Sequence, residues 1–356
     1  MGKLIIILSL LLPTIVSALP PITTSGNQVL YGGKQGSLAG NSFFWSNNTY
    51  GGERYYNRET VAWLKQNWNT TIIRAAMGVE DSMGFIDDPE SNRNRVIALV
   101  DAAIAEDLYV IIDWHSHHAE KNPNNEAKAI EFFANMAQRY GNSNNVIFEI
   151  YNEPIDSSWQ AIKTYAEKVI PAIRAHSDNL IIVVTPFFSQ RVDQASDNPI
   201  TGYDNIAYTL HFYAGTHSDG LRNNALTALD NGIPLFVTEW GSVNADGNGG
   251  VAQAETERWM AFLAENNISH LNWAVNDKQE GASVIRPGTS TSSNWPESAL
   301  TDSGRLVRDI IRNCDSVDLS TPVDPVDPVD PVDPVDPVDL DKIQVVPVID
   351  LLLDQQ

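Results

Sequence analysis

The chain has 356 residues, 43% of them hydrophobic and nine of them Trp. This composition excludes a disordered polypeptide and suffices for one large buried core. The formal net charge of −22 repels phosphate backbones and anionic lipids, so we expect no nucleic-acid partner, no membrane partner and an uncharged substrate. Cys314 is the only cysteine, which excludes an internal disulfide.

Residues 1–18 predict a secretory signal peptide. Lys3 precedes an apolar run from Leu4 to Leu12, and small residues suit cleavage after Ala18. The alternative is a transmembrane helix, but spanning a bilayer needs about 20 apolar residues, and this run is shorter. We therefore expect a secreted, extracellular protein.

Residues 19–314 predict a single α/β domain, because short apolar runs alternate there with longer amphipathic segments. Strands are expected near residues 37–45, 71–77, 108–114, 146–151, 180–185, 206–212, 234–240 and 270–274. Helices are expected near residues 96–106, 126–140, 158–175, 221–230, 252–265 and 298–312. This order predicts a (β/α)8 TIM barrel, in which the strand ends converge on one face. The alternative is an open doubly wound sheet, but no glycine-rich phosphate loop follows the first strand.

The composition changes at residue 315. Consecutive Pro-Val-Asp triplets fill residues 322–339, where proline holds the chain extended and aspartate keeps it solvated. We predict an extended, disordered linker over residues 315–340. A short C-terminal tail over residues 341–356 then follows, with no second module expected.

Two glutamates stand at the ends of predicted strands. Glu153 lies in an Asn-Glu-Pro sequence, and Glu239 lies in Thr-Glu-Trp-Gly. A carboxylate at the end of an apolar run is costly to bury unless the site uses it. Cleavage of a glycosidic bond needs one protonated carboxyl and one ionised carboxylate, which favours a glycosidase. The alternative is that one or both glutamates form structural ion pairs.

Further polar and aromatic residues end other predicted strands. Arg74 would keep a nearby glutamate ionised, although a structural ion pair is an equal alternative. His115, His211 and Tyr213 offer donors for sugar hydroxyls. Trp273 would stack on a sugar face, with ordinary core packing as the alternative.

The run His115-Ser116-His117-His118 raises the alternative of a zinc site. No further ligand at helical spacing accompanies this run. We therefore expect no metal and no other cofactor.

These residues together resemble glycoside hydrolase family 5, particularly its bacterial-type endoglucanases. The resemblance extends from about residue 37 to residue 314. It rests on motifs in family order: Ile73-Arg74, Asp113-Trp114-His115, Tyr151-Asn152-Glu153-Pro154, Leu210-His211-Phe212-Tyr213-Ala214-Gly215-Thr216-His217, Thr238-Glu239-Trp240-Gly241 and Asn272-Trp273.

The resemblance implies a (β/α)8 barrel and a retaining mechanism, with Glu153 as acid/base and Glu239 as nucleophile. It implies that Arg74 and Tyr213 hold the nucleophile and that Asn152 contacts the sugar 2-hydroxyl. The other site residues that it implies bind sugar: His115, His211 and Trp273 at the central subsite, Lys278 and Glu280 on the non-reducing side, Phe188 on the leaving-group side and Trp45 as a distal platform.

We therefore expect a secreted, monomeric endo-β-1,4-glucanase, or cellulase, acting on cellulose and soluble β-glucans. Its catalytic carboxyl groups should lie about 5 to 5.5 Å apart, as retention requires. Alternatives on the same scaffold are a mannanase, a xyloglucanase or a mixed-linkage β-glucanase. An alternative of another class is a catalytically inactive glycan-binding protein.

Overall fold

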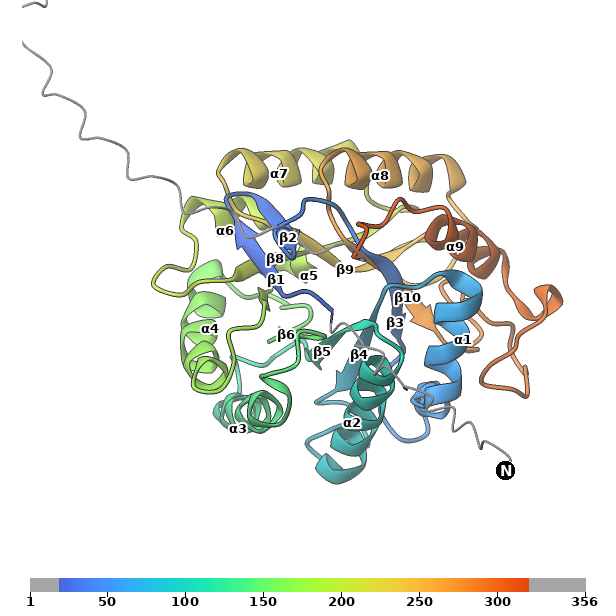
Figure 1. The fold of residues 1–356 in the computed structure, drawn as a ribbon, viewed down its shortest axis with the longest axis horizontal. Helices are drawn as coiled ribbons and strands as arrows, with labels where there is room; N and C mark the ends of the chain where they lie inside the picture. The colour runs from blue at the N-terminus through green and yellow to red at the C-terminus, as the bar shows by residue number, and fades with distance from the viewer. Residues whose placement is uncertain (1–18, 320–356) are drawn as a thin grey trace, which may run out of the picture. The chain divides into compact units, whose positions relative to one another are not determined.

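The computed structural model describes residues 19–319 and contains a closed barrel of parallel strands (Figure 1). Each strand pairs with the next in chain order, and β10 pairs with β3 to close the ring. The predicted (β/α)8 barrel is confirmed. The strands are β3 Ala39–Phe43, β4 Ile72–Gly78, β5 Tyr109–His115, β6 Val146–Glu149, β7 Ile181–Val183, β8 Ile206–Tyr213, β9 Leu235–Gly241 and β10 His270–Val275.

The predicted signal peptide and C-terminal tail lie outside the described residues, as does the linker beyond residue 319. Within residues 19–319, no helix is long and apolar enough to cross a membrane.

Helices surround the barrel on its outer side (Figure 1). They are α1 Arg58–Trp68, α2 Pro89–Ala105, α3 Pro123–Tyr140, α4 Trp159–Arg174, α5 Pro186–Ser189, α6 Val192–Asp197, α7 Asp219–Asp230, α8 Gln253–Glu265 and α9 Asp302–Arg312, with 3₁₀ turns η1 Gly52–Tyr55 and η2 Glu297–Ala299.

Capping residues explain where two helices differ from the prediction. The helix predicted from residue 96 begins at Pro89, because the Asp88 side chain accepts a hydrogen bond from the Ser91 N–H and proline suits the first turn. The unpredicted helix α1 begins after Asn57, whose side chain accepts from Thr60 N–H. Polar caps thus fixed helix starts that apolar periodicity did not reveal.

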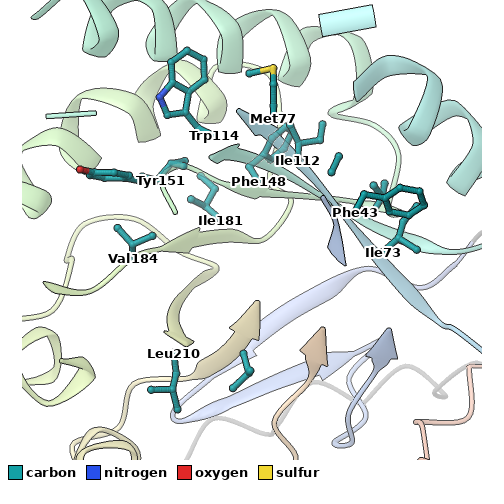
Figure 2. Close-up of a cluster of buried hydrophobic side chains, with 14 of the residues drawn as sticks. Phe43, Ile73, Met77, Ile112, Trp114, Phe148, Tyr151, Ile181, Val184 and Leu210 are labelled. Carbon is teal, nitrogen blue, oxygen red and sulfur yellow. The ribbon is translucent and has the colours of Figure 1, made fainter. Parts of the chain in front are cut away.

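Strand alternation separates two hydrophobic layers. On β5, Val110, Ile112 and Trp114 belong to the cluster shared with the surrounding helices, and Figure 2 shows Ile112 and Trp114 within it. Tyr109 and Ile111 belong to a smaller cluster inside the barrel. Successive side chains point to opposite faces of a strand, so the last inward positions remain for polar groups.

An antiparallel hairpin closes one end of the barrel. It consists of β1 Ile22–Ser25 and β2 Gln28–Tyr31, and Figure 1 shows it lying across the barrel. Its apolar side chains pack against residues at the starts of the barrel strands, such as Ile72 and Tyr109. The hairpin was not predicted. It leaves the opposite end, where the strands finish, for the site.

Strand β9 contains a β-bulge immediately before Glu239. Between two aligned pairs, Leu210 of β8 stands opposite both Val237 and Thr238 of β9. The pairing of β9 with β10 shifts over the same segment. An extra residue resets the two-residue alternation, so consecutive side chains of Thr238 and Glu239 both contact groups inside the barrel.

Candidate active site

A cleft lies at the carboxyl ends of the strands, with an empty volume of about 550 Å³. Both strand-end glutamates, Glu153 and Glu239, line it. Trp45, Tyr213 and Trp273 line the same cleft. The structure therefore brings together residues that the sequence separates by more than half of the chain.

Glu239 is held at both carboxylate oxygens. Nη1 of Arg74 lies 3.0 Å from Oε2, and the Tyr213 hydroxyl donates to Oε1 over 2.7 Å. Burial, followed by the negative charge of Glu239, raises the pKa of Tyr213 well above its ordinary value, so the phenol remains a donor. A cation and a donor stabilise the ionised carboxylate.

Arg74 also contacts other groups inside the barrel. Its Nε lies 2.6 Å from Oε2 of Glu149, and its Nη2 lies 2.9 Å from Oδ2 of Asp113 and 2.7 Å from Oδ1 of Asn152. Burial raises the pKa of Asp113 to about 8 and that of Glu149 to about 7, although Arg74 opposes both shifts. Burial alone would lower the pKa of Arg74, but the surrounding carboxylates outweigh it and raise the pKa. One guanidinium thus organises several buried acids.

Glu153 has a different environment. His211 Nδ1 lies 2.9 Å from its Oε1, and 16% of the Glu153 side chain remains exposed to the cleft. Burial raises the pKa of Glu153 to about 7, with His117 and Arg74 opposing the shift. Burial lowers the pKa of His211 to about 4, so its imidazole is neutral at neutral pH. Glu153 can therefore hold a proton near neutral pH.

The two carboxyl groups lie close together. One ligand atom from each of Glu153, His211 and Glu239 lies within 4.8 Å of the others. Inverting glycosidases separate their carboxyl groups by about 6.5 to 9.5 Å to admit a water molecule, whereas retaining enzymes hold them about 5 to 5.5 Å apart. The short spacing suits direct attack by one carboxylate.

Among the described residues, Glu153, His211 and Glu239 are the one set whose spacing would suit a metal ion. Its members already have protein partners: Arg74 and Tyr213 for Glu239, and His211 for Glu153. The close approach of the three side chains is therefore accounted for by contacts within the protein.

The predicted histidine run does not act as one cluster. His115 Nδ1 lies 2.7 Å from Oδ2 of Asp113. His117 Nδ1 lies 3.0 Å from the backbone oxygen of Glu153, and the His118 side chain is exposed. The three imidazoles thus do not share hydrogen-bond partners, although His115 and His117 line the same cleft with ring centres 6.4 Å apart.

Aromatic rings form one wall of the cleft. Trp273 stacks on His115 with ring centres 5.0 Å apart and planes inclined by 3°. Trp45 meets His115 edge-on at 4.6 Å, and Phe44 lies 5.4 Å from Trp273. Flat apolar rings beside polar donors are suited to the faces and hydroxyls of sugar rings.

Lys278 and Glu280 line the same cleft. Lys278 Nζ lies 2.6 Å from Oε2 of Glu280 and 5.4 Å from the centre of the Phe44 ring. A backbone bond from Ala282 N–H to the Gly247 carbonyl ties this segment to the loop after β9. Both predicted residues thus reach the cleft from one loop.

A second pocket lies over the loops after β7 and β8, with an empty volume of about 810 Å³. Phe187, with 59% of its surface exposed, lines it together with His217 and Leu221. The predicted leaving-group-side residue, Phe188, is only partly exposed and is absent from this lining. Phe187, not Phe188, is therefore the ring that lines this pocket.

The reason is an unusual backbone conformation. Residues 187–189 have φ values of 55°, 54° and 58°, which non-glycine residues rarely adopt. Phe188 N–H donates to the Pro154 carbonyl, and the Ser189 hydroxyl donates to the Asn152 carbonyl. These bonds fix the turn to the Asn-Glu-Pro loop and direct Phe187 outward.

Sequence reasoning missed other residues of the site. Glu149 and Thr238 are buried polar residues within apolar strands, and Phe44 belongs to the aromatic wall. The available signal was a polar residue inside an apolar run, since such a group needs a buried partner.

Comparison with known proteins gives a consistent assignment. The sequence profile of the cellulase family, glycosyl hydrolase family 5, matches residues 25–279. Endoglucanase Z of Dickeya dadantii is 56% identical over 299 residues, covering 83% of this chain and 67% of that relative. An endoglucanase of Clostridium saccharobutylicum is 45% identical over 258 residues, covering 71% of this chain and 57% of the relative. The chain thus spans between roughly half and two thirds of the length of such relatives.

Solved structures support the same family assignment. A structure from Cytophaga hutchinsonii has a TM-score of 0.79 and 47% identity, covering 83% of this chain and 95% of that chain. The catalytic domain of a Thermobifida fusca endoglucanase has a TM-score of 0.77 and 32% identity, covering 82% of this chain and 97% of that chain. The chain belongs to the cellulase family, glycosyl hydrolase family 5.

Proposed function

We propose that this protein is an endo-β-1,4-glucanase that hydrolyses internal bonds of cellulose and related β-glucans with retention of anomeric configuration. The observation that carries the proposal is the close carboxyl pair of Glu153 and Glu239, with Glu239 held by Arg74 and Tyr213. The names of the endoglucanase relatives support a glucan substrate. A variant of the Thermobifida fusca enzyme was solved with cellotetraose.

In the first step, an ionised oxygen of Glu239 attacks the anomeric carbon. Glu153 transfers its proton to the departing glycosidic oxygen as the carbon–oxygen bond breaks. A covalent ester joins the sugar to Glu239, and Glu153 becomes a carboxylate. Arg74 and Tyr213 orient Glu239 for the attack, since both carboxylate oxygens have fixed partners.

In the second step, the Glu153 carboxylate removes a proton from water. The water oxygen attacks the anomeric carbon, and the ester bond to Glu239 breaks. Glu153 regains its proton and Glu239 regains its charge, so the protein returns to its starting state. Two displacements at one carbon give net retention.

Two surfaces with aromatic rings support cleavage within a chain. Trp45, Phe44 and Trp273 lie in the cleft with the catalytic pair, while Phe187 lines the neighbouring pocket over other loops. A polysaccharide that extends in both directions would contact both surfaces.

The first experiment measures reducing-sugar release from carboxymethylcellulose, β-mannan, xyloglucan and mixed-linkage β-glucan. We expect the highest kcat/KM on the β-1,4-glucan, with β-anomers as the initial products by NMR. Preference for mannan or xyloglucan would contradict the substrate assignment, and initial α-anomers would contradict retention.

We further propose that the protein is secreted as a monomer. The signal-like sequence before residue 19 is the basis for secretion alone. Expression of the full chain in a secreting host, followed by N-terminal sequencing of the extracellular protein, should give a mature chain that begins at Leu19. Size-exclusion chromatography with light scattering tests the monomer.

A further inference from the structure

A chain of hydrogen bonds leads from Glu153 into the barrel. His211 Nδ1 lies 2.9 Å from Oε1 of Glu153, and His211 Nε2 lies 2.8 Å from Oγ1 of Thr238. The Thr238 hydroxyl then donates to Oε1 of Glu149 over 2.5 Å. His211, Thr238 and Glu149 are buried, with at most 1% of each residue exposed.

The inner end of this chain reaches the other catalytic carboxylate. Oε2 of Glu149 accepts from Arg74 Nε over 2.6 Å, and Nη1 of the same guanidinium holds Glu239. Glu149 therefore contacts Arg74, a partner of Glu239, directly, and it reaches His211, the partner of Glu153, through Thr238. Glu149 itself does not line the cleft.

We propose that Glu149 and Thr238 are positioning residues that fix the tautomer of His211 and so favour the protonated form of Glu153. This inference rests on the proposed function, because it assigns Glu153 as the acid. The bulge in β9 makes the arrangement possible, since it places Thr238 beside Glu239 on the inner side of the strand.

The number of protons that each group can donate fixes the direction of the hydrogen bonds in this chain. A hydroxyl donates one proton. Thr238 donates its proton to Glu149, so it accepts a hydrogen bond from His211 Nε2. A neutral imidazole with its proton on Nε2 has only a lone pair on Nδ1. The Nδ1 contact is then a hydrogen bond only if Glu153 supplies the proton.

Other charged groups surround the chain. Arg74 of β4, Asp113 of β5 and His211 of β8 face Glu149, and the Thr209 hydroxyl of β8 donates to its Oε1 over 3.3 Å. Glu153 is faced by His117 and Arg74 as well as by His211. Thr238 carries no charge, so its replacement interrupts the chain without changing the charge of the site.

The test compares the pH dependence of kcat/KM in three variants on carboxymethylcellulose. Thr238→Val removes the bridging hydroxyl and should lower the apparent pKa of the alkaline limb by about one unit. Thr238→Ser restores the hydroxyl and should restore the wild-type limb. Thr209→Val is the matched control, because it removes a hydroxyl from the same Glu149 oxygen but outside the chain. An alkaline limb in Thr238→Val that equals that of Thr209→Val overturns the inference.

Glu149→Gln gives an independent prediction. Arg74 Nε requires an oxygen acceptor, so the new amide NH₂ would face Thr238 and donate to it. The chain would then reverse, with His211 donating from Nδ1 to an ionised Glu153. We expect the apparent pKa of the alkaline limb to fall. The loss of rate should be smaller on dinitrophenyl cellobioside, whose leaving group needs no proton, than on carboxymethylcellulose. An unchanged limb in a folded variant contradicts the inference.

A spectroscopic measurement separates this inference from the proposed function. In ¹⁵N NMR of the wild-type protein at neutral pH, His211 should be the neutral tautomer protonated at Nε2. Protonation at Nδ1 overturns the inference whatever the enzyme hydrolyses. A protein that releases no sugar from any β-glucan overturns the proposed function, while the tautomer still decides the inference.

Discussion

Arg74 and Glu239 form an ion pair that is almost completely removed from solvent. Nη1 of Arg74 lies 3.0 Å from Oε2 of Glu239, and the exposed side-chain fractions are 0% and 5%. The same guanidinium also pairs with Glu149 and Asp113. Loss of this planar fork would leave several buried carboxylates with fewer partners.

Replacement of Arg74 by lysine should therefore strongly reduce both stability and activity. The ammonium cannot bind the separate acceptors that the guanidinium binds, so we expect the free energy of unfolding to fall by about 3 kcal/mol. The rate should also fall sharply. Denaturant titration and kcat on carboxymethylcellulose measure both effects. Arg139→Lys is the control, because Arg139 and its partner Asp101 are half-exposed. Equal behaviour of the two variants would contradict the prediction.

The two glutamates should respond differently to replacement. Glu239→Ala removes the nucleophile and should abolish turnover on every substrate. Glu153→Ala should lower kcat on carboxymethylcellulose by about 100-fold or more, yet retain much of the rate on dinitrophenyl cellobioside. Glu257→Ala, at an exposed position of α8, is the control. If Glu153→Ala lowered the rate on both substrates equally, Glu153 would not be the proton donor.

The alkaline limb of the pH–rate profile should report Glu153. Burial raises the pKa of Glu153 to about 7, and the first step needs its protonated form. The rate should therefore be intact below this value and fall as the pH rises through about 7. Measurement of kcat/KM between pH 4 and pH 9 checks the sign. An alkaline limb that is absent on a substrate requiring a proton donor would be inconsistent with this assignment.

Phe187 should affect long substrates selectively. It is 59% exposed and lines the pocket beside the catalytic cleft. Loss of a stacking ring at a sugar subsite costs about 1 kcal/mol, so Phe187→Ala should raise KM for cellohexaose about fivefold. The KM for dinitrophenyl cellobioside should not change. Leu226→Ala removes an exposed apolar side chain of α7 and is the control. A similar KM for cellohexaose in both variants would exclude the pocket as a sugar site.

Much of the fold was predictable because the dominant signal was local. Each barrel strand is buried along its length, as the apolar runs of β4 and β5 require. The alternation of these runs with helices then limits the topology to a few choices. The hairpin β1–β2 escaped prediction because its strands are only four residues long, too short for a clear periodicity.

The sequence by itself determined the strand order and placed Glu153, Glu239 and Tyr213 near strand ends, whereas Arg74, also predicted at a strand end, lies within β4. It did so because burial and backbone pairing leave strand ends as the place for polar groups. Only the tertiary structure decided the contacts of Glu149 and Thr238, because a bulge in β9 resets the side-chain alternation. Likewise, the left-handed turn at residues 187–189 made Phe187, not Phe188, the exposed ring. Both features depend on hydrogen bonds to distant segments, which no local pattern records.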